Sequence, residues 1–285
     1  MDIFANKVPL RVLRCFYRSP RRVLSVPEIA GVLGTSRASV HRRIDQLRGS
    51  GILRVQETGR RRVYSLDPIS PLAEPFFELF NHERYLEVAP QVRLALMRLV
   101  REIDKDRVRS IILFGSHARG LATSRSDVDL CIVTKGNREI KESQFGINVG
   151  RYYADIRLEP HVYPERDFSD VPNLAVLDAI QIGISLFGHS FLFEKRVSQR
   201  SISKESLLAR LDGSRENLER SRHVIGEARK YFEGIVEVSL SEIESVVSSG
   251  TTIPRRMLVP KRRFKERIVD LEGRLANMGE VIWLE

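Results

Sequence analysis

The chain has 285 residues, of which 42% are apolar and 29% charged, as in an ordinary soluble protein of two or three domains. Its two cysteines, Cys15 and Cys131, stand far apart without ligand-spaced neighbours, which excludes a disulfide framework or a zinc finger and predicts a cytoplasmic protein. The formal net charge is +10, and residues 1–70 hold nearly all of it, with 14 Lys and Arg against 5 Asp and Glu.

The basic N-terminal segment has the pattern of three helices followed by a hairpin. Helices are expected over residues 8–18 and 26–33, and either Thr35 or Ser36 can cap a third helix. This third helix carries one apolar stripe, made of Val40, Ile44 and Leu47. Two short alternating strands around the turn ETGR follow it. The order resembles a winged helix-turn-helix domain, which we assign to residues 1–70.

A winged-helix domain implies binding of double-stranded DNA. The exposed face of the third helix would enter the major groove, and the hairpin tip would meet phosphates, whose contacts weaken steeply with salt. The residues assigned to DNA contact are Ser36, Arg37, His41, Arg42, Arg60, Arg61 and Arg62. The alternative interpretation is a solvated helix face on a domain that mediates protein contacts, including those of a homodimer.

The middle of the chain begins with helices and changes to strands. Residues 71–104 carry apolar side chains at helical spacing and contain no reactive cluster. We assign residues 71–88 to a helical linker and residues 89–195 to a central α/β domain. The continuous apolar run VRSIILF, which begins at Val108, then predicts a strand buried on both faces.

The stretch LFGSHARGLATSRSDVDLCIV, residues 113–133, joins two apolar strands through a polar loop. Gly115 lets the backbone come close to a phosphate, and Ser116 can donate through both its N–H and its hydroxyl. Asp127 and Asp129 stand two apart at the start of the second strand, so their carboxylates share one face and repel each other at neutral pH. A cation is therefore expected between them.

The segment GSHARGLATSRSDVDL fills every fixed position of the motif GSxxxGxxxxxSDxDL. It thereby resembles the minimal nucleotidyltransferases of the DNA polymerase beta superfamily. The resemblance implies a mixed sheet, an NTP substrate, ATP above all, and two Mg²⁺ ions, or Mn²⁺, that bind the attacking and leaving oxygens. The implied metal ligands are Asp127 and Asp129. The residues assigned to the nucleotide are Gly115, Ser116, Arg119 and Ser126, although Arg119 fits a solvated loop equally well.

The family places a third carboxylate on a later strand, where it binds the metal nearest the nucleophile and can act as general base. Asp155 and Glu159 both fit, because they share one face of a strand predicted within residues 153–168. Laying the family's usual strand end on LEPHVYPERDF favours Glu159 as the catalytic and metal-binding residue, with Asp155 as the alternative. Pro160 departs from the family pattern and indicates a strand edge or a bulge.

The remainder of the chain is predicted to be mostly helical. Residues 171–193 approach the ~20 residues of a membrane span, but polar residues interrupt them, so a buried helix and a short strand are expected and no membrane contact. Residues 196–285 form the predicted C-terminal helical region, with a helix break near Gly234 and a basic tail around residues 255–267. The tail is either a solvated face or a guide for an acidic substrate.

The sequence as a whole predicts a multi-domain α+β protein with two alternative functions. The first is a magnesium-dependent nucleotidyltransferase that moves NMP from an NTP to a hydroxyl of a protein, an RNA or a small molecule, coupled to DNA binding. The second is a DNA-binding transcription regulator, or a toxin-antitoxin component, whose nucleotidyltransferase domain senses a nucleotide or has lost turnover.

Overall fold

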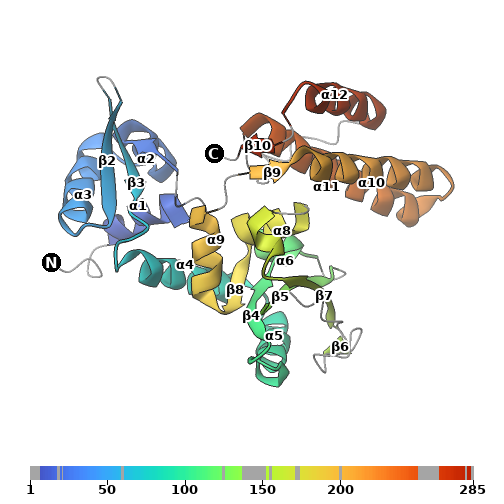
Figure 1. Cartoon of the computed structure of the whole chain (residues 1–285), viewed down its shortest axis with the longest axis horizontal. Helices are drawn as coiled ribbons and strands as arrows, with labels where there is room; N and C mark the ends of the chain where they lie inside the picture. Colours follow the sequence, from blue (N-terminus) through green and yellow to red (C-terminus); the bar gives the residue numbers. More distant parts are fainter. Residues whose placement is uncertain are drawn as a thin grey trace. The chain divides into compact units, whose positions relative to one another are not determined.

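The computed structural model describes residues 7–17, 20, 22–58, 61–123, 126–136, 152–153, 156–170, 174–198, 201–249, 263–279 and 281–283. Figure 1 shows the helices and strands of the chain, and contacts between residues divide it into two compact units. The first comprises residues 1–134, 140–162 and 182–198, and the second comprises residues 135–139, 163–181 and 199–285. The predicted α+β class, with a winged helix, a mixed sheet and C-terminal helices in that order, is confirmed. Among the described helices, none is long and apolar enough to cross a membrane.

The N-terminal domain has the predicted winged helix-turn-helix form. Three helices pack on one another, α1 (Lys7–Tyr17), α2 (Val26–Leu33) and α3 (Arg37–Gly49). The apolar stripe of α3 is buried, and the hydroxyl of Ser36 caps the helix by accepting a bond from the N–H of Ser39 at 3.2 Å. Three strands form an antiparallel sheet in the order β1-β3-β2, namely β1 (Leu24–Ser25), β2 (Leu53–Thr58) and β3 (Arg61–Leu66).

A five-stranded sheet forms the centre of the first unit. Its spatial order is β6-β7-β5-β4-β8, with β4 (Val108–Leu113), β5 (Val128–Thr134), β6 (Tyr152–Tyr153), β7 (Ile156–Pro164) and β8 (Ile184–Phe187). Strand β4 pairs antiparallel with both β5 and β8, and every residue of it except Arg109 is buried. The sequence predicted a strand buried on both faces, and the burial of β4 explains its continuous apolar run.

Helix α4 (Ala73–Glu87) packs closely on the sheet, in the segment assigned to a linker. It contacts β8 and also α9 (His189–Ser198), a helix that the sequence did not predict. Helix α5 (Pro90–Glu102) contacts β8 as well. Since the winged helix and the sheet lie in one unit, α4 contributes to the core between them; the domain bounds assigned above remain predictions.

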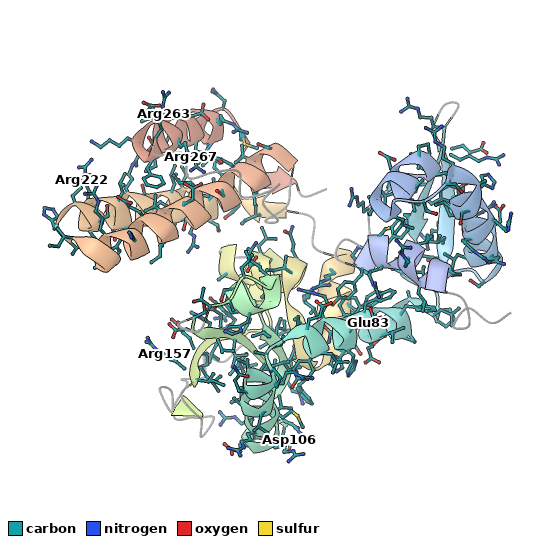
Figure 2. The ribbon with its side chains drawn as sticks, turned by 180° about the vertical axis from the view of Figure 1, so that it is seen from behind. Glu83, Asp106, Arg157, Arg222, Arg263 and Arg267 are labelled. Carbon is teal, nitrogen blue, oxygen red and sulfur yellow. The ribbon has the colours of Figure 1, made fainter. Side chains whose placement is uncertain are left out.

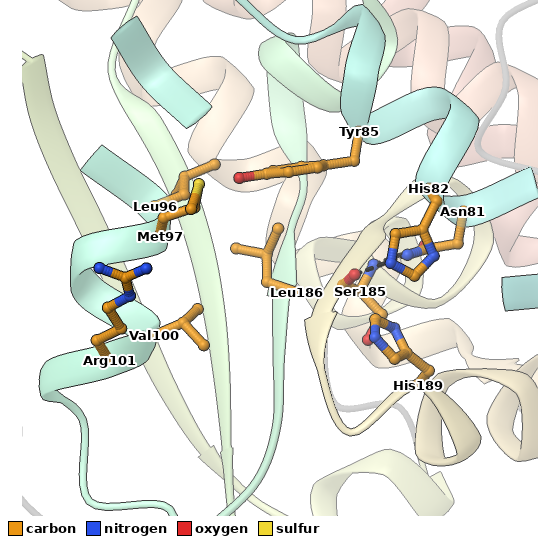
Figure 3. Close-up of a pocket in the computed structure, with 10 residues that line it drawn as sticks. All are labelled: Asn81, His82, Tyr85, Leu96, Met97, Val100, Arg101, Ser185, Leu186 and His189. Carbon is orange, nitrogen blue, oxygen red and sulfur yellow. Dashed lines mark hydrogen bonds between the residues drawn. The ribbon is translucent and has the colours of Figure 1, made fainter. Parts of the chain in front are cut away.

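The side chain of Asn81 on α4 closes the outer edge of β8. Its Nδ2 donates to the carbonyl oxygen of Ser185 at 2.7 Å, and its Oδ1 accepts from the N–H of Ser185 at 2.8 Å (Figure 3). Asn81 is 1% exposed, so both bonds lie away from water. A buried amide thus takes the place of a further strand and satisfies backbone groups that an edge strand leaves unpaired.

The second unit holds the C-terminal helices. Three of them pack on one another, α10 (Lys204–Arg222), α11 (Gly226–Ser249) and α12 (Phe264–Ala276). The unit also contains α7 (Asp167–Asp170), α8 (Leu174–Ile182) and the antiparallel pair β9 (Ser201–Ser203) and β10 (Val281–Trp283). The predicted break near Gly234 is wrong, because α11 runs through Gly234 and the chain reverses at residues 223–225. One glycine weakens a helix by only about 1 kcal/mol, which packing readily offsets.

The basic tail lies largely outside the described residues, and its described arginines have acidic partners. Arg267 of α12 lies 2.7 Å from both Glu237 and Glu244 of α11, and its side chain is 15% exposed (Figure 2). Arg263 lies 3.3 Å from Glu266. Arg267 therefore holds two helices together and is not displayed to an acidic substrate.

Candidate active site

The motif of residues 115–130 places a glycine turn directly against a carboxylate. The expected polar loop begins as one helical turn, α6 (Gly115–Arg119), which follows β4 without a gap beyond Phe114. Gly115 has φ +65°, and a Cβ on it would collide with Oδ2 of Asp129 and lie 2.8 Å from its Cγ. A side chain at position 115 would therefore displace the Asp129 carboxylate, which explains the glycine here.

Asp129 lies on β5 and Asp127 immediately precedes the strand, two positions away, where the alternation of side chains puts both on the same side. Val128 and Leu130 are fully buried, whereas Asp127 and Asp129 are only partly buried. The carbonyl oxygen of Asp129 accepts a bond from the N–H of Phe114 at 3.0 Å, which continues the β4–β5 pairing up to the turn. The pairing of the two strands thus fixes the turn and the carboxylates in register.

Strand β7 adds the third predicted carboxylate. Leu158 and Pro160 are buried on one face of β7, and Arg157, Glu159 and His161 lie on the other. Strand β7 neighbours β5 in the sheet, so Glu159 is carried on the strand beside the two aspartates. Asp155, the alternative third acid, lies outside the described residues.

The two neighbouring carboxylates act on Asp129 electrostatically. Burial, followed by the negative charges of Glu159 and Asp127, raises the pKa of Asp129 from 3.8 to about 6. Two backbone N–H groups, those of Asp129 itself and of Ser116, donate to this carboxylate and partly oppose the shift. The site therefore gathers more negative charge than its own donors neutralise.

A positive side chain already faces this charge. Nη1 of Arg157 lies 3.5 Å from Oδ2 of Asp127, in a pair that is partly open to solvent (Figure 2). In the described part of the chain, no three His, Cys, Asp or Glu side chains are grouped closely enough to hold a metal ion. The chemical type of these side chains nevertheless suits a hard cation, because carboxylate oxygens are the ligands that Mg²⁺ prefers.

The other residues assigned to the nucleotide have structural contacts as well. The hydroxyl of Ser126 accepts a bond from the N–H of Thr123 at 2.9 Å, and its carbonyl lies 3.5 Å from Nε2 of His117. Ser126 therefore shapes the loop between α6 and β5. Arg119 is the last residue of α6 and is partly buried.

The face assigned to DNA is exposed on α3 and on the hairpin. Exposed side chains there are Arg37, His41, Arg42, Arg61 and Arg62. Some carry intramolecular contacts, since Nδ1 of His41 lies 3.1 Å from Asp45 and Nε of Arg62 lies 3.2 Å from Glu57. Arg60 lies outside the described residues. The hydroxyl of Ser36 is engaged as the cap of α3.

A cavity that sequence reasoning missed lies between α4, α5 and β8. It has a volume of about 250 Å³ and is lined by apolar side chains that include Tyr85, Leu96 and Leu186 (Figure 3). His189 lies at its other side, and burial lowers the pKa of this imidazole. The Nδ1 atom of His189 is buried without a hydrogen-bond partner among the described residues. Residues from three separate segments form this cavity, so no local sequence signal marks it.

Two regions of the chain match known families. Residues 96–178 match the nucleotidyltransferase domain family, and residues 4–56 match a helix-turn-helix domain family. A curated relative from Methanocaldococcus jannaschii, named "Putative protein adenylyltransferase", is 41% identical over 64 residues. The match covers 21% of this chain and 65% of that relative, less than two thirds of its length. No solved structure matches the chain. The predicted resemblance is thereby confirmed, and the chain carries a nucleotidyltransferase domain behind an N-terminal helix-turn-helix domain.

Proposed function

We propose that this chain is a divalent-metal-dependent nucleotidyltransferase that transfers NMP from an NTP to a hydroxyl group. The observation that carries the proposal is the partly buried Asp129, which lies against the Gly115 turn and is influenced by the charges of Glu159 and Asp127. The name of the Methanocaldococcus jannaschii relative supports AMP as the transferred group and a protein as the acceptor. The two free thiols, Cys15 and Cys131, support a reducing, cytoplasmic location.

Asp127, Asp129 and Glu159 would hold the metal ions. Mg²⁺ or Mn²⁺, when bound, neutralises the triphosphate and the developing charge on the attacking and leaving oxygens. Burial and the charges of Glu159 and Asp127 raise the pKa of Asp129, which supports this assignment, since a bound cation would offset the repulsion. Arg157, which faces Asp127, would then be free to turn toward a phosphate.

The chain's own groups would position the reactants and move one proton. The Gly115 turn would keep the backbone close to the phosphates, with Ser116 and Ser126 as hydroxyl donors. Glu159 would accept the proton of the acceptor hydroxyl as that oxygen forms its bond to the α-phosphorus. The bond between the α-phosphorus and the pyrophosphate oxygen breaks in the same displacement.

The winged helix would bind double-stranded DNA. Its surplus of positive charge and its exposed face of Arg37, Arg42 and Arg61 suit a polyanion. Together with the sheet domain this gives a transferase coupled to DNA, with the acceptor a protein, an RNA or a small molecule.

A second function deserves a direct test, because one observation favours it. Among the described residues no group of three or more His, Cys, Asp or Glu side chains lies as close as a metal site requires, and Arg157 pairs with Asp127. A domain arranged in this way could bind an NTP and alter DNA binding without turnover, as a transcription regulator. An NTP that shifts duplex affinity without release of pyrophosphate would identify this regulator.

The first prediction concerns the carboxylates. The double substitution Asp127→Ala and Asp129→Ala should lower transfer of label from α-labelled ATP by at least about 100-fold, because charge stabilisation of the transition state is lost. Label would be followed on the chain itself and on added acceptors in the presence of Mg²⁺. The exposed Asp106→Ala is the control and should keep wild-type transfer. Equal labelling by wild type and the double variant would remove the enzymatic proposal.

The second prediction is a dependence of stability on pH. The folded state favours the protonated Asp129, so its contribution to stability is intact below its ordinary pKa of 3.8 and is lost as the pH rises through about 6. Without metal at about pH 8, Asp129→Asn should therefore melt about 2–4 °C above wild type, and at about pH 4 the two should coincide. Mg²⁺ should raise the melting temperature of wild type at the higher pH and leave Asp129→Asn unchanged. Coincident melting at both pH values would contradict the raised pKa.

The third prediction separates backbone strain from collision at the glycine turn. Gly115 and Gly120 both have positive φ, but a Cβ meets Asp129 only at position 115 and meets nothing within 4 Å at position 120. Both alanine variants should lose about 1–2 kcal/mol of stability from the backbone alone. Only Gly115→Ala should also abolish the effect of Mg²⁺ on melting, because it displaces the carboxylate. Loss of the Mg²⁺ effect in both variants would show that the collision is irrelevant.

The fourth prediction concerns the DNA face. Arg42→Gln should weaken binding to a labelled duplex and reduce the slope of log affinity against log salt by about one, as expected for one lost phosphate contact. The exposed Arg98→Gln on α5 removes the same charge outside the winged helix and should leave the slope unchanged. Fluorescence anisotropy at several salt concentrations measures both. If the slope of log affinity against log salt is the same for both variants, Arg42 does not contact the DNA backbone and the assigned face is wrong.

A further inference from the structure

Arg84 of α4 joins the candidate site to a second part of the fold. Its Nη2 donates to the carbonyl oxygen of Ala118 at 2.5 Å, and its Nη1 donates to the carbonyl oxygen of Gly183 at 3.2 Å. Ala118 belongs to α6, the helical turn that starts at Gly115. The planar guanidinium can reach two carbonyls at once, which a lysine cannot do in the same geometry. Arg84 thus stabilises the α6 turn, which begins at Gly115.

The guanidinium of Arg84 also contacts the ring of Tyr17, the last residue of helix α1 in the winged-helix domain. Tyr17 ends α1 and is 5% exposed, and the guanidinium carbon of Arg84 lies 5.8 Å from its ring centroid. A second arginine, Arg196, contacts the same ring, with its guanidinium carbon 4.9 Å from the ring centroid. The side chain of Arg196 is buried. Arg196 donates to the carbonyl oxygens of Tyr17 at 3.3 Å and of Gly183 at 2.7 Å. Two arginines therefore share one tyrosine and one carbonyl oxygen.

Tyr17 is seated firmly on α4. Its ring centroid lies 5.1 Å from that of Phe77 and 5.8 Å from that of Phe80, and its hydroxyl donates to Oδ1 of Asn81 at 3.4 Å. Asn81 in turn bonds the edge of β8 through Ser185. Because a packed core does not deform continuously, α1 cannot shift without moving the side chains that touch Tyr17. Arg84 is one of them.

The DNA face stands at the other end of this chain of contacts. Helix α1 packs on α3, the helix that carries Arg37 and Arg42. The contacts therefore run without interruption from α3 through α1 and Tyr17 to Arg84, then to Ala118 and the Gly115 turn. Every link is a contact within one compact unit.

We propose that Arg84 is a positioning residue that couples DNA held by the winged helix to the nucleotide site. When Tyr17 shifts, Arg84 shifts with it and moves α6, and the Gly115 turn that faces Asp129 moves as a result. The nucleotide half of this inference rests on the proposed function. Coupling of this kind is reciprocal, so a nucleotide at the site changes duplex affinity by the factor with which the duplex changes nucleotide affinity.

The fifth prediction tests this coupling on the full chain by binding. The affinity for a non-hydrolysable ATP analogue with Mg²⁺ would be measured by calorimetry, with and without a short random-sequence duplex at low salt. In wild type the duplex should shift this affinity about five-fold or more, in the range typical of allosteric pairs. Whatever its affinity for each ligand alone, Arg84→Gln should lose the shift that the duplex produces. Arg98→Gln, an equal change of charge on an exposed helix position, should keep it.

A second readout does not depend on the nucleotide. The N–H groups of Gly120 and Leu121 bond back to His117 and Ser116, so their hydrogen exchange reports on the α6 turn. The duplex should alter this exchange in wild type and not in Arg84→Gln. If the chain binds no nucleotide, the transferase proposal fails while this measurement still decides whether α6 responds to DNA through Arg84.

Three outcomes would overturn the inference. These are a wild-type chain that binds no duplex, a duplex that changes neither nucleotide affinity nor α6 exchange, and a wild-type shift that persists in Arg84→Gln. If Arg84→Gln does not fold, Arg84→Lys keeps the charge beside Tyr17 but loses the two-carbonyl geometry. It should then show a reduced shift, and an undiminished shift in Arg84→Lys would also count against the proposal.

Discussion

The candidate site depends on one constraint, a partly buried carboxylate that lies against a backbone turn and is repelled by two neighbouring carboxylates. Burial and the charges of Glu159 and Asp127 make the ionised Asp129 unfavourable, and the missing Cβ of Gly115 leaves the carboxylate the space that it occupies beside the turn. Such an arrangement is relieved by a proton or by a cation. The glycine, the spacing of the aspartates and the strand that carries Glu159 all follow from keeping this charge in place.

Two polar side chains of helix α4 stabilise the strand edge and the turn beside that site. Asn81 closes the edge of β8 and Arg84 holds the carbonyl oxygen of Ala118, and both side chains belong to α4. A helix assigned to a linker by its sequence thus contributes the polar groups that fix the edge strand and the turn. Buried polar groups of this kind specify one arrangement, because each would be costly to leave unpaired.

What could be predicted from sequence was local. The apolar stripe of α3 and its Ser36 cap follow from residues a few positions apart, and the motif from Gly115 to Leu130 places the turn and the aspartates on adjacent strands. The bonds of Asn81 to Ser185 and of Arg84 to Ala118 span 104 and 34 residues and leave no periodic signal. The break assigned to Gly234 failed because packing of α11 on its neighbours outweighs the weak helix propensity of one glycine.

The winged helix is rich in positive charge and the candidate site gathers carboxylates, and under the proposed function this difference would restrict what each region binds. The winged helix attracts polyanions over about one Debye length, roughly 8–10 Å at moderate salt. The carboxylates around Asp129 repel the same polyanions unless a cation accompanies them. Under the proposed function, a triphosphate would approach Asp129 only together with positive charge, whereas DNA phosphates would need no metal at the winged helix. If both ligands bind as proposed, charge alone would keep them apart, and the contact of Arg84 with Ala118 would be a route by which either ligand influences the other.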